Sequence, residues 1–239
     1  MLQVYLLGTV EFETALAFQK KLLYDVSGNR EQSALILCEH PPLISVGRQG
    51  SRAHIHYEPA ELQVRRWPIR WVNRGGGCVL HLPGQLAMYP ILPLDRLGLS
   101  LAGYLRLIGS IVTDVLADFH LRTPVQAKSS GVFVGPRPLA SIGVAVRDWV
   151  SYFGAYVNVQ PSLTPYRKVL PGRGNDEPMT SLERERRGPV RAALVRERLI
   201  ELWSERLGCS STALFSEHPF LRAFERRPAQ PSLVGRQST

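Results

Sequence analysis

Apolar residues recur at the spacing of one helix face in several stretches of the chain. These stretches cover residues 11–26, 101–119 and 189–207. Ser100 precedes the second stretch and can cap a helix there, while Pro189 and Gly208 mark the two ends of the third. The spacing therefore predicts amphipathic helices, each of which buries one apolar face against a core.

Shorter apolar runs, interrupted by Pro and Gly residues, have the pattern of β-strands and turns. These runs cover residues 2–8, 33–47, 66–94 and 131–159. The last of them predicts a meander of strands. Because only two long helices separate the strands and several spacings fit hairpins, the pattern favours an α+β fold. We expect a mixed β-sheet with flanking helices rather than a regular βαβ winding.

Length and composition fit one globular domain. The chain has 239 residues, of which 44% are hydrophobic and 21% charged, and no linker interrupts it. We predict a single domain over residues 1–208 and a C-terminal extension over residues 209–239 that is partly disordered. No apolar run reaches the roughly 18 residues of a spanning helix, and no signal-peptide pattern opens the chain. We therefore expect a cytoplasmic protein without a membrane partner.

Charge and cysteine usage exclude several classes of site. The formal net charge is +9, but basic residues are interleaved with acids and no nucleic-acid module is recognisable. Such a surface attracts acidic partners, and we expect no specific nucleic-acid partner. Cys38, Cys78 and Cys209 lack CxxC spacing, which favours reduced thiols. His54 and His56 alternate as strand neighbours would, but without a third ligand we expect no metal.

Four segments resemble one family in the same order along the chain. They read LCEHPPLISVGRQG (37–50), RGGGCVLHLPGQLAMYPIL (74–92), LASIGVAVRDWVSYFGAYVNV (139–159), and TPYRKVLPG followed by TSL (164–172 and 180–182). Together they resemble the octanoyltransferases of lipoate biosynthesis, which have the biotin/lipoate protein ligase fold. The resemblance extends over about residues 1–208.

The resemblance implies a function in protein lipoylation. Family members transfer an octanoyl group from octanoyl-acyl carrier protein to a lysine of a lipoyl carrier domain, and they need no cofactor. The carrier domains belong to 2-oxoacid dehydrogenase subunits and to the glycine cleavage H protein. A family cysteine takes the acyl group as a thioester, and a nearby lysine holds that cysteine as the nucleophilic thiolate.

The resemblance also implies an acyl pocket, in which glycine backbone lies against the alkyl chain and loop N–H groups face the thioester oxygen. The residues implied are Arg74, Gly75, Gly76, Gly77, Cys78, Val79, Leu80, His81, Ser141, Ile142, Gly143, Gly154, Ala155 and Tyr156.

The chain departs from the family at both catalytic positions. Gly172 stands where the family has its cysteine, and Pro138 stands where it has its lysine. Loss of the nucleophile from an enzyme with a covalent intermediate costs on the order of 10⁶ in turnover. The usual mechanism is therefore not expected here.

Several residues could replace the missing pair. Cys78 is a candidate nucleophile in the glycine loop, or a small packed residue of an apolar run. His81 could be a general base, or it could hold the Pro83-Gly84 turn. Lys128 and Lys168 are candidate cations, and Arg137 adjoins Pro138 but cannot shuttle a proton.

Catalytic activity stays open at this point. One interpretation is an acyltransferase that works by direct transfer from the bound thioester to the carrier lysine, or through Cys78. A second is a noncatalytic protein that binds acyl chains or carrier domains. A third is an ATP-dependent lipoate ligase, although the segment that carries the ligase lysine reads GPRPLASIG here.

Overall fold

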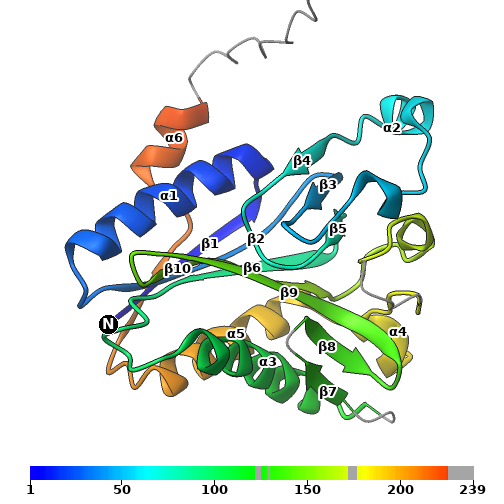
Figure 1. Ribbon diagram of the computed structural model, residues 1–239. Coiled ribbons are helices and arrows are strands. Elements are labelled where there is room, and N and C mark those ends of the chain that lie inside the picture. The colour runs from blue at the N-terminus through cyan, green and yellow to red at the C-terminus, as the bar shows by residue number, and fades with distance from the viewer. Residues whose placement is uncertain (122–124, 129, 172–176, 226–239) are drawn as a thin grey trace, which may run out of the picture.

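The computed structural model describes residues 1–121, 125–128, 130–171 and 177–225 (Figure 1). Its strands are β1 (Leu2–Thr9), β2 (Ser33–Glu39), β3 (Leu43–Val46), β4 (Ile69–Trp71), β5 (Cys78–His81), β6 (Gln85–Ile91), β7 (Val125–Lys128), β8 (Gly131–Val134), β9 (Arg137–Arg147), β10 (Val150–Asn158) and β11 (Thr212–Phe215). Its helices are α1 (Phe12–Gly28), α2 (Pro59–Arg65), α3 (Leu101–Ala117), α4 (Leu182–Arg186), α5 (Ala192–Arg206) and α6 (Pro219–Glu225).

The strands of the described chain form two mixed sheets. The larger has eight strands in the order β11-β1-β2-β6-β10-β9-β8-β7, and β1 is parallel to both β2 and β11. The smaller has the order β4-β3-β5, with β3 parallel to β4 and antiparallel to β5. The predicted α+β fold, a mixed sheet with flanking helices, is confirmed.

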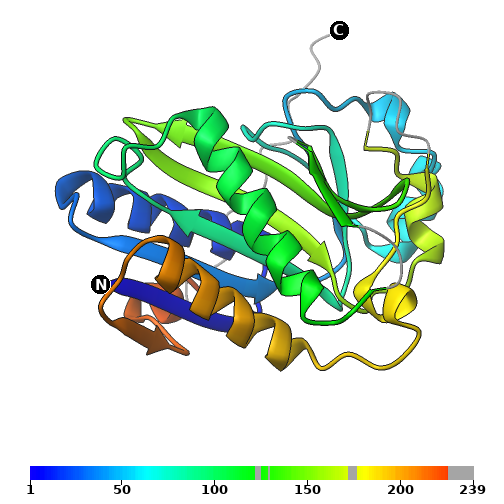
Figure 2. The ribbon, with the colours of Figure 1, turned by 90° about the horizontal axis from the view of Figure 1, so that it is seen from below.

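Helices cover both faces of the large sheet. Helix α1 lies on one face, while α3 and α5 lie side by side on the other (Figures 1 and 2). The core under α3 and α5 includes the fully buried Tyr104 and Trp203, and the core under α1 includes Phe18 and Tyr156. A third apolar cluster, with Ile44 and Leu80, packs around the small sheet.

The predicted helices form where the hydrophobic spacing placed them. Ser100 caps α3, because its side-chain oxygen accepts a hydrogen bond from the Gly103 N–H at 3.1 Å. The third helix starts at Ala192 rather than Pro189, and Val190 is buried in the core ahead of it.

The run at residues 33–47 behaves differently from a simple pair of neighbouring strands. Its first part becomes β2 in the large sheet and its second part becomes β3 in the small one. The break falls at Pro41-Pro42, which lack the N–H groups that a continuous ladder needs. This separation of the two sheets creates the space for the site described below.

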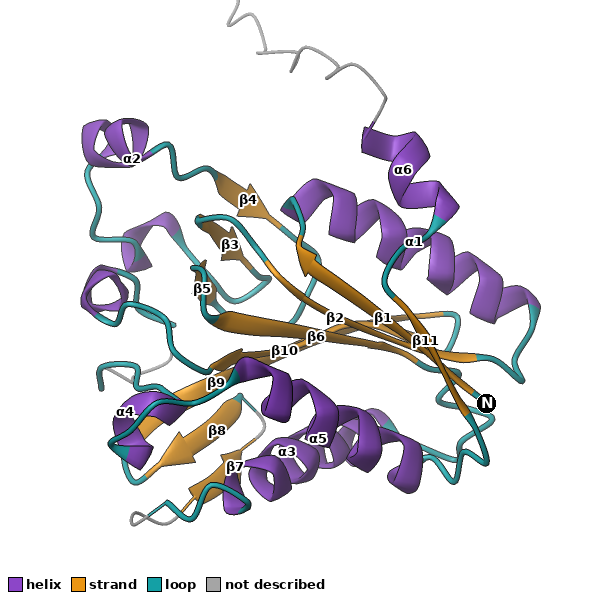
Figure 3. Ribbon diagram, turned by 180° about the vertical axis from the view of Figure 1, so that it is seen from behind, coloured by secondary structure: helices purple, strands orange, loops and turns teal. Residues whose placement is uncertain are grey.

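The described part of the C-terminal extension continues the same fold. Strand β11 pairs with the edge of β1, and α6 packs beside α1 (Figure 3). Residues 226–239 lie outside the described residues. Within the part of the chain that is described, no helix has the length and apolar composition needed to cross a membrane.

Candidate functional site

A cavity of about 540 Å³ lies where the glycine-rich loop before β5 meets strands β7, β8 and β9. Met179 and the residues next to it close another side. Of the residues predicted to form an acyl pocket, those that line this cavity are Arg74, Gly76, Gly77, Cys78, Val79, Ser141 and Ile142.

The remaining predicted pocket residues are not part of the cavity lining, and those of β10 lie in a strand that contributes no lining residue. Gly75 joins the loop to β9, because its N–H donates to the Val144 carbonyl at 2.8 Å. The others are Leu80 and His81 in β5, Gly143 in β9, and Gly154, Ala155 and Tyr156 in β10.

Arg74 is the central polar residue of the site and is only 1% exposed. Its Nη2 donates to the carbonyl and the hydroxyl oxygen of Ser45 at 3.0 and 2.8 Å, and its Nη1 donates to the Gly75 carbonyl at 3.0 Å. The guanidinium carbon lies 5.6 Å from the ring centre of Tyr156. Among the described residues no carboxylate pairs with Arg74, so neutral acceptors compensate the desolvation of its Nη atoms, while its buried Nε has no hydrogen-bond partner there.

Two glycines make room for this arginine. A Cβ on Gly47 would lie 2.8 Å from Nη1 of Arg74, and one on Gly143 would lie 3.2 Å from it. The same added atoms would approach the carbonyl oxygens of Gly76 and Gly75 to 2.5 and 2.6 Å. Gly76 also has φ +77, which favours glycine. Gly47 of the Gly-Arg pair and Gly143 of the Ile-Gly pair thus leave the space that the guanidinium occupies.

His81 is buried beside Ser45, the residue that also binds Arg74. Its Nε2 and the Ser45 hydroxyl are hydrogen-bonded at 2.7 Å, and its ring packs edge-on against Tyr156. Burial, with His40 and Arg74 nearby, holds the pKa of His81 well below its usual value, so the imidazole is neutral at neutral pH. This position separates His81 from the cavity surface, where a general base would act.

The Pro83-Gly84 turn is held by a different side chain. The Gly84 N–H donates to a carboxylate oxygen of Glu39 at 2.8 Å. The next residue, His40, bridges the Val10 carbonyl and the Tyr89 hydroxyl at 2.8 and 2.7 Å, and burial lowers its pKa to about 4. Sequence reasoning assigned no role to Glu39 or His40, although their Glu-His-Pro-Pro motif was the available signal.

The structure describes one of the two positions at which the resemblance predicts a departure from the family. Pro138 lines the cavity, pairs with Phe133 of β8, and accepts a hydrogen bond from the Thr180 N–H at 2.8 Å. Gly172 lies outside the described residues, but Pro171 and Met179 on either side of that segment line the cavity. Phe133 and Met179 are lining residues that the sequence motifs did not indicate.

Cys78 lines the cavity but is 3% exposed, and its thiol donates to the Ser51 carbonyl at 3.4 Å. Burial raises the pKa of this thiol and outweighs the opposing effect of Arg74. Because the thiolate is the nucleophile, the environment of Cys78 disfavours catalysis at neutral pH.

The candidate cations differ in their surroundings. Lys128 lines the cavity, with its Nζ 4.7 Å from the ring centre of Phe133. Lys168 is paired with Glu61 at 2.7 Å, and Arg137 is paired with Glu185 at 2.8 Å. Neither of those two residues lines the cavity. In the described ranges, His54 and His56 gain no third ligand, since no group of three metal-ligating side chains occurs there.

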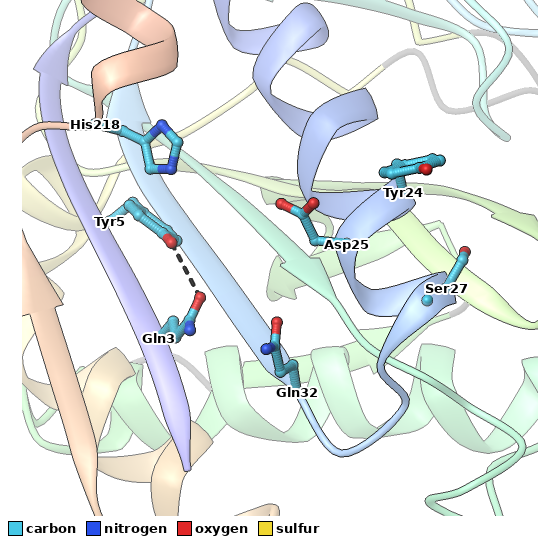
Figure 4. Close-up of a pocket in the computed structure, with 8 residues that line it drawn as sticks. Gln3, Tyr5, Tyr24, Asp25, Ser27, Gln32 and His218 are labelled. Atoms are coloured by element: carbon cyan, nitrogen blue, oxygen red, sulfur yellow. Dashed lines mark hydrogen bonds between the residues drawn. The ribbon is translucent and has the colours of Figure 1, made fainter.

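A second hollow, of about 700 Å³, lies between the start of β1 and the end of α1 (Figure 4). Tyr5, Tyr24, Asp25 and His218 are among its lining residues, and the Tyr5 hydroxyl donates to Gln3 at 3.0 Å. It contains none of the motif residues and no buried cation. The cavity of about 540 Å³ beside Arg74 is therefore the candidate site.

Comparison with known proteins agrees with this geometry. A family model described as "Lipoyl protein ligase A/B catalytic domain" matches residues 11–203. An octanoyltransferase of Geotalea uraniireducens is 37% identical over 193 residues, which cover 81% of this chain and 87% of that protein. One of Geobacter metallireducens is 38% identical over 176 residues, covering 74% and 79%.

A solved structure of lipoate-protein ligase A bound with ATP has a TM-score of 0.74. The alignment covers 94% of this chain and 92% of the ligase chain, at 17% sequence identity. This similarity shows a shared fold. The chain belongs to the lipoyl protein ligase A/B catalytic domain family. Within it, the chain is a homologue of the octanoyltransferases of lipoate biosynthesis.

Gly143→Ala tests the packing around Arg74. The added methyl group would meet the Gly75 carbonyl and the guanidinium, so we expect the free energy of unfolding to fall by about 1–3 kcal/mol. Urea denaturation followed by circular dichroism measures this change. Gly188→Ala is the matched control, because nothing lies within 4 Å of the added atom. Equal stability of both variants would contradict the close packing.

Alkylation rates test the state of the Cys78 thiol. Since a raised pKa leaves little thiolate at neutral pH, we expect iodoacetamide to modify Cys78 at least about tenfold more slowly than the half-buried Cys209. Peptide mass mapping over time gives both rates. Modification of Cys78 faster than that of Cys209 would instead support Cys78 as the nucleophile.

Proposed function

We propose that this protein binds an octanoyl group in the cavity beside Arg74 and transfers it from octanoyl-acyl carrier protein to a lysine of a lipoyl carrier domain. The transfer is direct and has no acyl-enzyme intermediate. The observation that carries the proposal is a cavity lined by the glycine loop and by apolar side chains, with Pro138, which the resemblance assigns to the family lysine position, in its wall. The octanoyltransferase relatives support the substrate class.

The cavity offers an apolar surface for the alkyl chain. Val79, Phe133, Ile142 and Met179 line it together with Pro138. At about 0.8 kcal/mol for each buried methylene group, an octanoyl chain gains roughly 5 kcal/mol from leaving water. This gain is enough to hold the acyl group in place without a covalent bond.

The glycine loop binds the carbonyl end of the octanoyl group. Gly76 and Gly77 line the cavity, and their N–H groups are suited to donate to the thioester oxygen and to the oxyanion that replaces it. The positive charge of Arg74 strengthens the field at this end, because the guanidinium is buried and without a carboxylate partner in the described chain.

The transfer then needs only the two substrates. The lone pair of the carrier lysine amine attacks the thioester carbon and forms a carbon–nitrogen bond. The tetrahedral intermediate collapses as the carbon–sulfur bond breaks, and the departing thiolate takes up the proton that the nitrogen loses. Holding both reactants in place supplies the rate enhancement, since an intramolecular-like arrangement can lower the barrier by about 7–11 kcal/mol.

A noncatalytic binding role is the second candidate. It is favoured by Pro138 itself, because a proline in the cavity wall removes the cation but keeps an apolar surface for the chain. Such a protein would hold an acyl group or an acylated carrier without turnover. An ATP-dependent ligase is less favoured, because the segment GPRPLASIG lacks the ligase lysine.

Intact-mass analysis separates these functions. The protein is incubated with octanoyl-acyl carrier protein and an apo lipoyl domain, with and without ATP. Direct transfer predicts an octanoylated lipoyl domain without ATP and no hydroxylamine-labile adduct on the protein itself. A second arm with octanoic acid and ATP tests ligation.

The double variant Pro138→Lys/Gly172→Cys is the control for mechanism. By resemblance it restores the family pair, so it should acquire a hydroxylamine-labile acyl adduct that the parent protein lacks. Retention of the acylated carrier without modification of the lipoyl domain would favour the binding role. Absence of both binding and transfer would contradict the proposal.

A further inference from the structure

The charges around the cavity are unbalanced. Arg74 and Lys128 line it, and Glu177 is the acidic side chain among its described lining residues. Arg74 is 1% exposed, and in the described ranges neither of the two cations forms an ion pair with a carboxylate. A buried guanidinium without a counter-charge favours the entry of a negatively charged group.

Lys128 lines the same cavity as Pro138, although the β7 residue in direct register with Phe133 and Pro138 is Gln126. On β7, Lys128 pairs with Gly131 of β8, and Gly131 pairs in turn with Ser141 of β9. Directly opposite residues in neighbouring strands share a face of the sheet. Phe133, over whose ring the Lys128 ammonium lies, is the strand partner of Pro138. The ammonium of Lys128 therefore contacts the residue that pairs with Pro138.

Gly131, the strand partner of Lys128, brings β8 and β9 close together. A Cβ there would lie 2.1 Å from the Ala140 carbonyl oxygen, so this close approach of β8 and β9 requires glycine. Two strand spacings, about 10 Å, separate β7 from β9. The contact with Phe133 places the ammonium against a side chain of the intervening strand.

We infer that Lys128 supplies from β7 the cation that Pro138 does not, and that together with Arg74 it binds the carboxylate of a medium-chain fatty acid whose alkyl chain lies in the cavity. This inference rests on the proposed acyl cavity and adds a second ligand, the free acid, and the residue that selects it over the uncharged thioester. An ammonium offers three donors to a carboxylate, and charge-assisted hydrogen bonds are the stronger kind.

Calorimetric titration with octanoate and with octanamide tests the role of the charge. The two ligands have nearly the same shape, but only octanoate is charged at neutral pH. Lys128→Met should weaken octanoate binding by about tenfold, the effect of one charge-assisted hydrogen bond, and should change octanamide binding by less than about twofold. Lys128→Arg should keep most of the octanoate affinity, because it keeps the positive charge.

Lys168→Met is the matched control. Lys168 also lies over an aromatic ring, that of Tyr57, but its ammonium is paired with Glu61 away from the cavity. The Lys168→Met variant should bind octanoate and octanamide with the affinities of the parent protein.

Three outcomes would overturn the inference. If Lys128→Met binds octanoate as tightly as the parent protein, Lys128 has no role, while the proposed acyl cavity stands. An equal loss of both ligands would show a role in packing rather than in charge. If the parent protein binds neither ligand, the acyl cavity and the inference fail together.

Discussion

The buried guanidinium of Arg74 is the interaction on which the rest of the site depends. It links Ser45 of the small sheet to the glycine loop and packs over Tyr156 of the large sheet. Because neutral acceptors surround it in the described chain, the surrounding backbone must be placed closely to offset the cost of burying a charge. Gly47 and Gly143 allow that placement, since a side chain at either position would collide with the arginine or its loop. The cavity is the space that remains when the two sheets are joined in this way.

The sequence predicted the elements better than their arrangement. Helical spacing located α1, α3 and α5 because each buries one continuous apolar face. It did not indicate that β2 and β3 belong to different sheets, since local patterns contain no information about strand partners. The glycine loop and the Ser-Ile-Gly segment were identified through family resemblance. The contribution of Phe133 could not be foreseen, because it depends on the register between β8 and β9.

The proposed direct transfer depends on two residues, Pro138 and Cys78, that line the cavity. Pro138 keeps its place in the wall through its backbone, whose carbonyl accepts from Thr180, so the side chain could change without loss of the strand. Cys78 lies in the same cavity, but burial raises its pKa and makes it a poor substitute. The cavity thus offers apolar lining residues, while the thiol of Cys78 within it is not activated. This combination favours binding energy and proximity over covalent catalysis.

Photoaffinity labelling tests most directly the claim that this cavity holds the acyl chain. An octanoic acid analogue with a diazirine at its far end is irradiated with the protein, and the labelled peptides are mapped by mass spectrometry. The account predicts labels on the segments that carry Val79, Ile142 or Met179, and loss of these labels with excess octanoate. Labels confined to the hollow with Tyr24 and His218, or labels that excess octanoate leaves unchanged, would contradict it.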